Sequence, residues 1–359
     1  MRVLVLMLLA LLWIPPAMAQ VQEPSPGRFS GAETVESLPD WFKTSFLELA
    51  DDLEEAGAAD RHVMLYFHQD GCPYCARLVR ENFHNDTLVA LLKAKFDSID
   101  INIWGDRELT DPAGRIHTEK TYAAAMMVQF TPTLLFLDPA GEVVLRANGY
   151  PSIPKLYAQL RYVSGRHYRD LSFPAYVEQL ALEAEAADGP SADRETAATG
   201  TLNAEAFFAG PPFDLTRSAR QPAARYLAVF FEAPGCDSCD ALHRTLLQEP
   251  GIREVLGQMQ VIQLDARSDT PVVTPEGRSL GARAWHAGLG LTELPAMVLF
   301  DYDGTEIIRK DAFFKAFHFE SILRYAQEGA FRNEPNFQRY LEARVARLRA
   351  LGEDVDIWK

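Results

Sequence analysis

The stretch YFHQDGCPYCARLVRENF, residues 66–83, places two cysteines three positions apart, between an apolar run and a segment with helical periodicity. Residues 230–247, FFEAPGCDSCDALHRTLL, repeat this arrangement in the second half of the chain. The chain holds four cysteines in all, Cys72, Cys75, Cys236 and Cys239. Such local pairs can bind a metal, form a structural disulfide or act in redox chemistry. The surrounding sequence favours one of these uses.

The repeat extends well beyond the cysteines. Pro132 follows Cys72 by 60 residues, and Pro295 follows Cys236 by 59. The stretches around these prolines, TPTLLFLDPAGEVVLRANGY and LPAMVLFDYDGTEIIRKDAF, align in register. Each copy begins with a continuous apolar run, typical of a strand buried on both faces. Each copy ends with two predicted strands joined by a turn, DPAG or DYDG. Strands separated by helices predict two α/β units, each built on a central sheet.

The predicted domain layout of the 359 residues follows from this repeat. We expect a first domain at 40–181, a linker at 182–203, a second domain at 204–329 and a C-terminal helical extension at 330–359. The linker is short of large apolar residues and rich in Ala, Glu and Asp, which favours a solvated segment. Residues 41–60 have the pattern of an amphipathic helix that packs on the first unit.

The C-terminal extension carries a stripe of apolar residues. Helical spacing relates Phe337, Tyr340, Leu341, Val345 and Leu348. We expect this stripe to pack in a core, and a helix that docks on a partner protein is the alternative.

The N-terminus has the three parts of a secretory signal peptide. Arg2 precedes an apolar run at 3–14, and the small-residue triplet Ala17-Met18-Ala19 follows it. The run is shorter than the roughly 20 residues that cross a bilayer as a helix. We therefore expect a signal peptide at 1–19, cleaved near Ala19/Gln20, and an exported protein that does not span the membrane after cleavage. An uncleaved N-terminal anchor is the alternative.

The overall charge argues against one class of partner. Thirty-five Lys and Arg residues against 50 Asp and Glu residues give a formal net charge of −15. A nucleic-acid partner is not expected, because binding the phosphate backbone needs a basic surface.

The positions of the cysteines favour redox chemistry over the other two uses. Zinc ribbons separate their pairs by roughly 15 to 20 residues, whereas each pair here sits in its own complete unit. A disulfide that closes so short a loop stabilises a fold very little. A Cys in the first turn of a helix points its sulfur at unpaired backbone N–H groups, which stabilise a thiolate. We expect Cys72 and Cys236 to be nucleophiles, Cys75 and Cys239 to resolve the mixed disulfide, and no bound cofactor.

Both units resemble thioredoxin-fold domains, through the strand that enters a CxxC pair at a helix N-terminus and the proline about 60 residues later. The resemblance implies an α/β fold with a central mixed sheet flanked by helices. It also implies that Pro132 and Pro295 are cis and pack against the CxxC pair. The backbones of Thr131 and Leu294, just before them, would then be free to pair with a bound peptide substrate.

The first unit is similar to a narrower group. YFHQDGCPYCARL and GEVVLRANGY resemble the periplasmic thioredoxins of bacterial sulfur-oxidation (Sox) gene clusters. This resemblance implies a periplasmic thiol–disulfide oxidoreductase that reduces protein disulfides. Its partners would be protein thiols or disulfides and a membrane or periplasmic electron donor. The alternatives are a disulfide isomerase or chaperone, and a thioredoxin-fold binding protein or metallochaperone, for which His286 and Met297 are weak candidate ligands.

Two features depart from thioredoxin itself. Thioredoxin has a buried Asp six residues before its nucleophile, where this chain has Tyr66 and Phe230. His68 and Glu232, each four residues before a nucleophile, can substitute for it, although strand-end residues facing solvent are the preferred interpretation. The spacers differ too, because Asp237 places a carboxylate beside Cys236 and is expected to raise the pKa of that thiol. We therefore hypothesise that the second site is the more reducing one.

Overall fold

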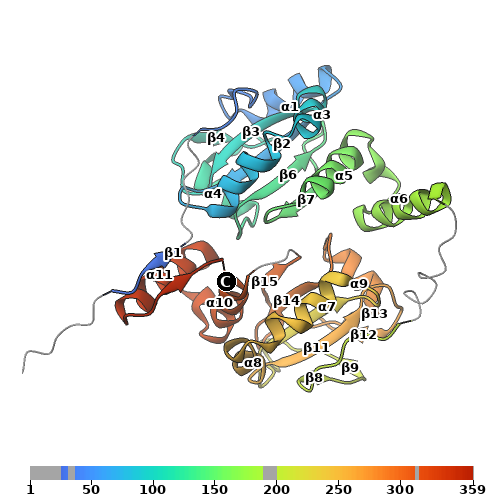
Figure 1. Cartoon of the computed structure of the whole chain (residues 1–359), viewed down its shortest axis with the longest axis vertical. Helices are drawn as coiled ribbons and strands as arrows, with labels where there is room; N and C mark the ends of the chain where they lie inside the picture. Colours follow the sequence, from blue (N-terminus) through green and yellow to red (C-terminus); the bar gives the residue numbers. More distant parts are fainter. Residues whose placement is uncertain (1–25, 31–36, 189–199, 312–314, 359) are drawn as a thin grey trace, which may run out of the picture.

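The computed structural model describes residues 26–30, 37–188, 200–311 and 315–358 (Figure 1). The predicted signal peptide at 1–19 and half of the predicted linker lie outside this range. The chain forms two α/β domains, drawn in blue to green and in yellow to red, which follow one another along the sequence. The predicted fold class is confirmed.

The first domain is built on a four-stranded mixed sheet in the order β3-β2-β6-β7. The strands are β2 (His62–His68), β3 (Phe96–Asn102), β6 (Thr133–Leu137) and β7 (Val143–Asn148). β2 runs parallel to β3 and antiparallel to β6. Alternate side chains of the central strands pack on opposite faces, and both faces are covered by helices. The continuous apolar run at the centre of β2 is explained by this double burial.

The helices of the first domain lie on both faces of this sheet. One face carries α1 (Leu49–Ala58) and α4 (Glu119–Ala125). The other carries α2 (Pro73–Arg77), the π-helical turn η1 (Leu78–Asn82), α3 (Asp86–Lys95) and α5 (Ile153–Ser164). The 3-10 turn η2 (His167–Arg169) and α6 (Phe173–Asp188) follow, so helix continues past residue 181 into the segment predicted to be a linker.

The second domain repeats this plan with a five-stranded sheet in the order β15-β14-β10-β11-β8. Its strands are β8 (Phe208–Ala209), β10 (Leu227–Glu232), β11 (Gln260–Asp265), β14 (Ala296–Phe300) and β15 (Glu306–Lys310). One face carries α9 (Ala282–Gly288). The other carries α7 (Asp237–Arg244), η3 (Leu246–Gln248), α8 (Pro250–Leu256) and α10 (Ala316–Gln327). Central β10 is parallel to β11 and antiparallel to β14, as β2 is to β3 and β6.

Each domain also has a short hairpin that the sequence analysis does not anticipate. β4 (Glu108–Thr110) pairs with β5 (Ile116–Thr118), and β12 (Pro271–Val273) pairs with β13 (Ser279–Gly281) and with β9 (Phe213–Asp214). The turns contain Gly114 and Gly277, whose φ angles of 76° and 85° lie in the left-handed region that favours glycine. The two hairpins therefore have equivalent turns at equivalent places in the repeat.

The helix predicted over residues 41–60 is only half formed. α1 begins at Leu49, while residues 42–46 carry no regular structure. The backbone N–H of Lys43 donates to the carbonyl of Ser98 on β3 instead of to a helical partner. The rings of Trp41 and Phe42 pack on Phe83, with centroids 5.6 and 5.3 Å away. Apolar periodicity at 41–48 thus reflects packing of an irregular segment against the domain core.

The C-terminal extension forms η4 (Ala330–Arg332), α11 (Phe337–Ala350) and β16 (Val355–Asp356), which pairs in parallel with β1 (Phe29–Ser30). Phe337, Tyr340 and Leu341 are buried in the same cluster as α8 and α10, whereas Val345 and Leu348 are only half-buried. Core packing, the expected role, is confirmed for the first three residues of the stripe. Among the helices that the structure describes, none has the length and apolar character needed to cross a membrane.

Candidate functional site

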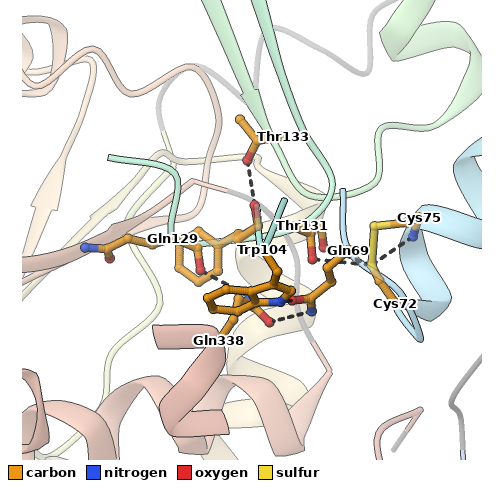
Figure 2. Close-up of a disulfide and its surroundings, with 9 residues drawn as sticks. Gln69, Cys72, Cys75, Trp104, Gln129, Thr131, Thr133 and Gln338 are labelled. Atoms are coloured by element: carbon orange, nitrogen blue, oxygen red, sulfur yellow. Dashed lines mark hydrogen bonds between the residues drawn. A yellow bond between two sulfur atoms is a disulfide. The ribbon is translucent and has the colours of Figure 1, made fainter. Parts of the chain in front are cut away.

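The first CxxC pair lies at the start of α2, next to the loop that precedes β6. Cys72 and Cys75 form a disulfide, and the sulfur of Cys72 caps α2 by accepting the backbone N–H of Cys75 at 3.1 Å. Thr131 donates its hydroxyl to the same sulfur at 3.4 Å (Figure 2). The Thr131-Pro132 peptide bond is cis. Residues 59 positions apart thus meet at one sulfur atom.

The second pair has the same local geometry. Cys236 and Cys239 form a disulfide at the start of α7, and the Cys239 N–H donates to the Cys236 sulfur at 3.1 Å. The Leu294-Pro295 peptide bond is cis. Both cis bonds agree with what the resemblance implies. The residue before the proline differs, because Leu294 has no hydroxyl to donate to the sulfur.

The two sites differ in exposure. Cys72 is 4% exposed, and its spacer residues Pro73 and Tyr74 are buried and half-buried. Cys236 is half-buried, and both residues of its spacer are exposed to solvent. Both resolving cysteines are buried, at 0% and 1% exposure. Cys236 is therefore the more exposed of the two nucleophilic residues.

Of the two residues considered as substitutes for the buried Asp of thioredoxin, only Glu232 is buried. Tyr66 and Phe230 are fully buried apolar neighbours of the two sites, and Glu232 has no exposed surface. The interpretation of Glu232 as a strand-end residue facing solvent is wrong. Glu232 is the last residue of β10, and its side chain meets α7. A buried carboxylate needs a hydrogen-bonding or charged partner there, because burial removes its water. His68 stays half-buried, with Nε2 3.5 Å from a carboxylate oxygen of Asp100.

The partner of Glu232 is His243, which the sequence analysis missed. The Nε2 atom of His243 lies 3.0 and 3.1 Å from the two carboxylate oxygens, and its Nδ1 lies 3.3 Å from Glu205. Burial disfavours the charged imidazole, but hydrogen bonds and charge from both carboxylates outweigh it and raise the pKa of His243. His243 follows Cys239 by four residues, so both side chains lie on one face of α7. This spacing of Cys239 and His243 was the sequence signal that could have indicated His243.

The weak candidate metal ligands lie in the core. His286 is 7% exposed, with its ring 5.4 Å from the ring of Phe231, and Met297 is 1% exposed within β14. Within the residues that the structure describes, no group of three or more His, Cys, Asp or Glu side chains is arranged to hold a metal ion. Both side chains are packed in the interior of the second domain.

Several solved structures are similar to parts of the chain. A thioredoxin-fold protein from Helicobacter pylori is 15% identical, covers 44% of this chain and 99% of its own, and has a TM-score of 0.34. A thioredoxin from Thermus thermophilus is 30% identical over 32% of this chain and 83% of its own, with a TM-score of 0.26. A component of the alkylhydroperoxide reductase from Enterococcus faecalis is 14% identical, covers 80% and 100%, and has a TM-score of 0.25. These low scores carry no argument about function.

One protein family matches both units of the chain. A search of curated proteins finds no match. The thioredoxin-like domain family matches residues 49–164 and 214–327, which together make up more than half of the chain. Each matched range contains one CxxC disulfide and one cis proline. The chain therefore belongs to the thioredoxin-like domain family, of which it carries two copies in tandem.

Proposed function

We propose that the protein is an exported thiol–disulfide oxidoreductase that reduces protein disulfides through two CxxC sites. The observation that carries this proposal is the shared geometry of the two sites. In each site, the first cysteine caps a helix, its sulfur accepts a backbone N–H from the second cysteine, and a cis proline precedes the strand that pairs with the central strand. Donors aimed at a sulfur stabilise its thiolate, which is the form that attacks a disulfide.

The reaction proceeds through a mixed disulfide. The thiolate of Cys72 or Cys236 attacks one sulfur of a substrate disulfide, so that a new S–S bond forms and a substrate thiolate leaves. The thiolate of Cys75 or Cys239 then attacks the nucleophile's sulfur and releases the second substrate thiol. The substrate gains two electrons and two protons, and the CxxC pair becomes the disulfide seen in the structure. In the second site, the Glu232–His243 pair is the proposed acceptor for the proton of Cys239.

Turnover requires a dithiol donor that returns two electrons to the CxxC disulfide at which the substrate has reacted. The proposed donor is a membrane or periplasmic protein, which follows from the signal-peptide pattern at 1–19 and the Sox-type resemblance of the first unit. Thr131 and Leu294 are the proposed substrate-binding residues, because their backbones precede the cis prolines beside the cysteines. The proposed compartment is the periplasm, where disulfides form and persist.

Loss of both nucleophiles tests the function. The wild-type protein, with dithiothreitol as donor, is expected to reduce insulin disulfides, and the Cys72→Ser/Cys236→Ser variant is expected to show only the uncatalysed rate. Precipitation of the insulin B chain, followed by turbidity, measures the reaction. The Cys75→Ser/Cys239→Ser variant is the matched control, because it keeps both nucleophiles and is expected to accumulate mixed disulfides. Wild-type protein that shows no turnover and carries a stoichiometric metal would favour the metallochaperone alternative instead.

The two sites are expected to have different reduction potentials, with the Cys236 site more negative by roughly 10–30 mV. The Thr131 hydroxyl stabilises the Cys72 thiolate, while the exposed carboxylate of Asp237 disfavours that of Cys236. A tenfold change in the exchange equilibrium is about 30 mV for two electrons. Equilibration with glutathione, using variants in which the other CxxC pair is replaced by serines, gives each potential.

Asp237→Asn supplies the control for this comparison of potentials. It removes the carboxylate without touching a cysteine and is expected to make the Cys236 site less reducing. A reduction potential of the Cys72 site that is equal to or more negative than that of the Cys236 site would contradict the hypothesis.

A further inference from the structure

The spacer of the first CxxC pair is covered by the C-terminal part of the chain. The ring of Tyr74, between the two cysteines, packs edge-on against the ring of Trp358, with centroids 5.1 Å apart. The ring of His318 from α10 also packs on Tyr74, with centroids 5.7 Å apart. Burial by these neighbours raises the pKa of Tyr74 to about 12. Tyr74 would face an incoming protein at this site, but here it contacts the second domain and the C-terminal extension.

The loop before Pro132 is covered by the first turn of α11. Asn336 caps this helix and thereby fixes the position of Gln338. The side chain of Gln338 donates to the carbonyl of Gln129 at 3.1 Å and accepts from Gln69 at 3.1 Å (Figure 2). Gln69 in turn accepts the indole N–H of Trp104 at 2.8 Å. The contact is therefore a hydrogen-bonded network that joins both sides of the site to α11.

Apolar contacts accompany this network. The ring of Phe337 lies 5.6 Å from that of Phe130, and Phe130 belongs to the buried cluster of the second domain although it comes from the first. The guanidinium of Arg339 lies over the ring of Trp104, 4.9 Å from its centroid. Together with Gln338, these residues cover the face of the loop that leads to Thr131 and Pro132.

The covering segment is held firmly by the second domain. Tyr340 packs on Tyr325 of α10 with centroids 5.1 Å apart, and Arg344 donates to the Ser321 hydroxyl at 3.2 Å. Buried and half-buried polar pairs also join the first domain to the second, among them Asn148 with Asp311 at 3.0 Å and Lys155 with Glu293. The first site is therefore uncovered only if α11 and the second domain move away together, or if the segment around Trp358 dissociates from Tyr74.

We propose that residues 336–358 form a cap that excludes protein disulfides from Cys72 while small disulfides and thiol reagents still reach it. A protein disulfide must bring several neighbouring residues next to the sulfur it reacts with, and the cap occupies that space on the spacer and on the cis-proline loop. In the second site, both spacer residues are exposed and Cys236 is half-buried. The first site thus selects by size, and the second is open. The inference rests on the proposed function and narrows it, because protein disulfides then react at Cys236, whereas small disulfides and thiols also react at Cys72. Its test does not depend on turnover.

Alkylation rates of single cysteines test the cap. Two reduced reporters are compared, one that keeps only Cys72 and one that keeps only Cys236, with the other three cysteines replaced by serine. Each is treated with iodoacetamide, which is small, and with a maleimide carrying a 5-kDa polyethylene glycol. For each reporter, the rate constant with the maleimide is divided by the rate constant with iodoacetamide. This division removes the difference in thiolate fraction between the two cysteines. This ratio is expected to be at least tenfold lower for Cys72 than for Cys236.

Variants of the cap complete the test. Gln338→Ala/Trp358→Ala is expected to raise the Cys72 ratio about tenfold and to leave the Cys236 ratio unchanged. Leu351→Ala is the matched control, because this side chain lies in the same segment and is 65% exposed. Trp358→Ala alone repeats the test in a variant that leaves α11 intact. Equal ratios at the two cysteines would overturn the cap, and a low Cys72 ratio that persists in both cap variants would assign the shielding elsewhere. Loss of insulin reduction with these ratios intact would overturn the proposed function alone.

Discussion

The His243→Leu variant is expected to lose about 3 kcal/mol of stability in the second domain at pH 6. The reason is the fully buried carboxylate of Glu232, which has His243 against both of its oxygens. Removing one partner of a buried ion pair leaves the other charge uncompensated, which typically costs about 3–5 kcal/mol. Urea unfolding of the full chain measures the loss of stability. Hydrogen exchange in peptides that contain β10 then assigns this loss to the second domain.

The pH dependence distinguishes an ion pair from simple packing. The pKa of His243 is raised in the folded protein, so the folded state binds its proton more tightly than the unfolded state. The contribution of this pair is therefore complete below the ordinary histidine pKa of about 6.5 and is lost as the pH rises through the raised value. The difference in unfolding free energy between wild type and His243→Leu is expected to be larger at pH 6 than at pH 9.

Glu254→Gln is a suitable control for this stability measurement. Glu254 pairs with Arg324 on the surface of the same domain, and its side chain is 62% exposed. Surface pairs contribute about 0–1 kcal/mol, so this variant is expected to stay close to wild type. A loss below about 1 kcal/mol for His243→Leu, or an equal loss at pH 6 and pH 9, would show that the pair is not an ion pair that stabilises the domain.

Much of each domain was predictable because its signals are local or repeated. The apolar run of β2, the helix after Cys72 and the turn after β6 are each encoded within a few residues. The spacing from Cys72 to Pro132, repeated from Cys236 to Pro295, supported the resemblance to thioredoxin-fold domains, and that resemblance implied the cis peptide bonds. Two imperfect copies of one pattern carry more information than either copy alone, since chance spacing does not recur in register.

The features that the sequence did not predict depend on contacts between distant segments. Glu205 and Glu232 precede His243 by 38 and 11 residues, and only the fold brings both carboxylates to its ring. The apolar stripe of α11 predicted burial, but periodicity shows that a helix face is covered, not what covers it. The first turn of that helix contacts both domains, with Phe337 against Phe130 and against Tyr325 at 5.5 Å. The surroundings of the two sites differ, because α11 contacts the loop before Pro132 and Cys72 is 4% exposed, whereas Cys236 is half-buried.

That difference leads to the second large effect. The Cys236→Ser variant is expected to lose at least 90% of its activity toward a protein disulfide such as insulin, whereas Cys72→Ser is expected to keep most of it. Cys236 is half-buried beside an exposed spacer, while Cys72 is 4% exposed next to the cap. Initial rates of insulin reduction, with dithiothreitol held in excess, measure both variants under one condition.

A small disulfide separates access from chemistry. With 5,5′-dithiobis(2-nitrobenzoate) as substrate, both single variants are expected to retain activity, because this molecule does not require the surface that residues 336–358 cover. The hydroxyl of Thr131, 3.4 Å from the Cys72 sulfur, favours its thiolate and so supports reaction of the first site with any disulfide that reaches it. The asymmetry is therefore expected for proteins and not for small molecules.

Restoring access is the strongest check on this explanation. Adding Gln338→Ala/Trp358→Ala to Cys236→Ser is expected to recover insulin reduction by several-fold, because the cap no longer holds the spacer and the cis-proline loop. Adding the exposed-surface change Leu351→Ala to Cys236→Ser is expected to recover none. If Cys72→Ser and Cys236→Ser each removed half of the activity toward insulin, both sites would serve protein substrates equally and the cap would not govern which disulfides each site reduces.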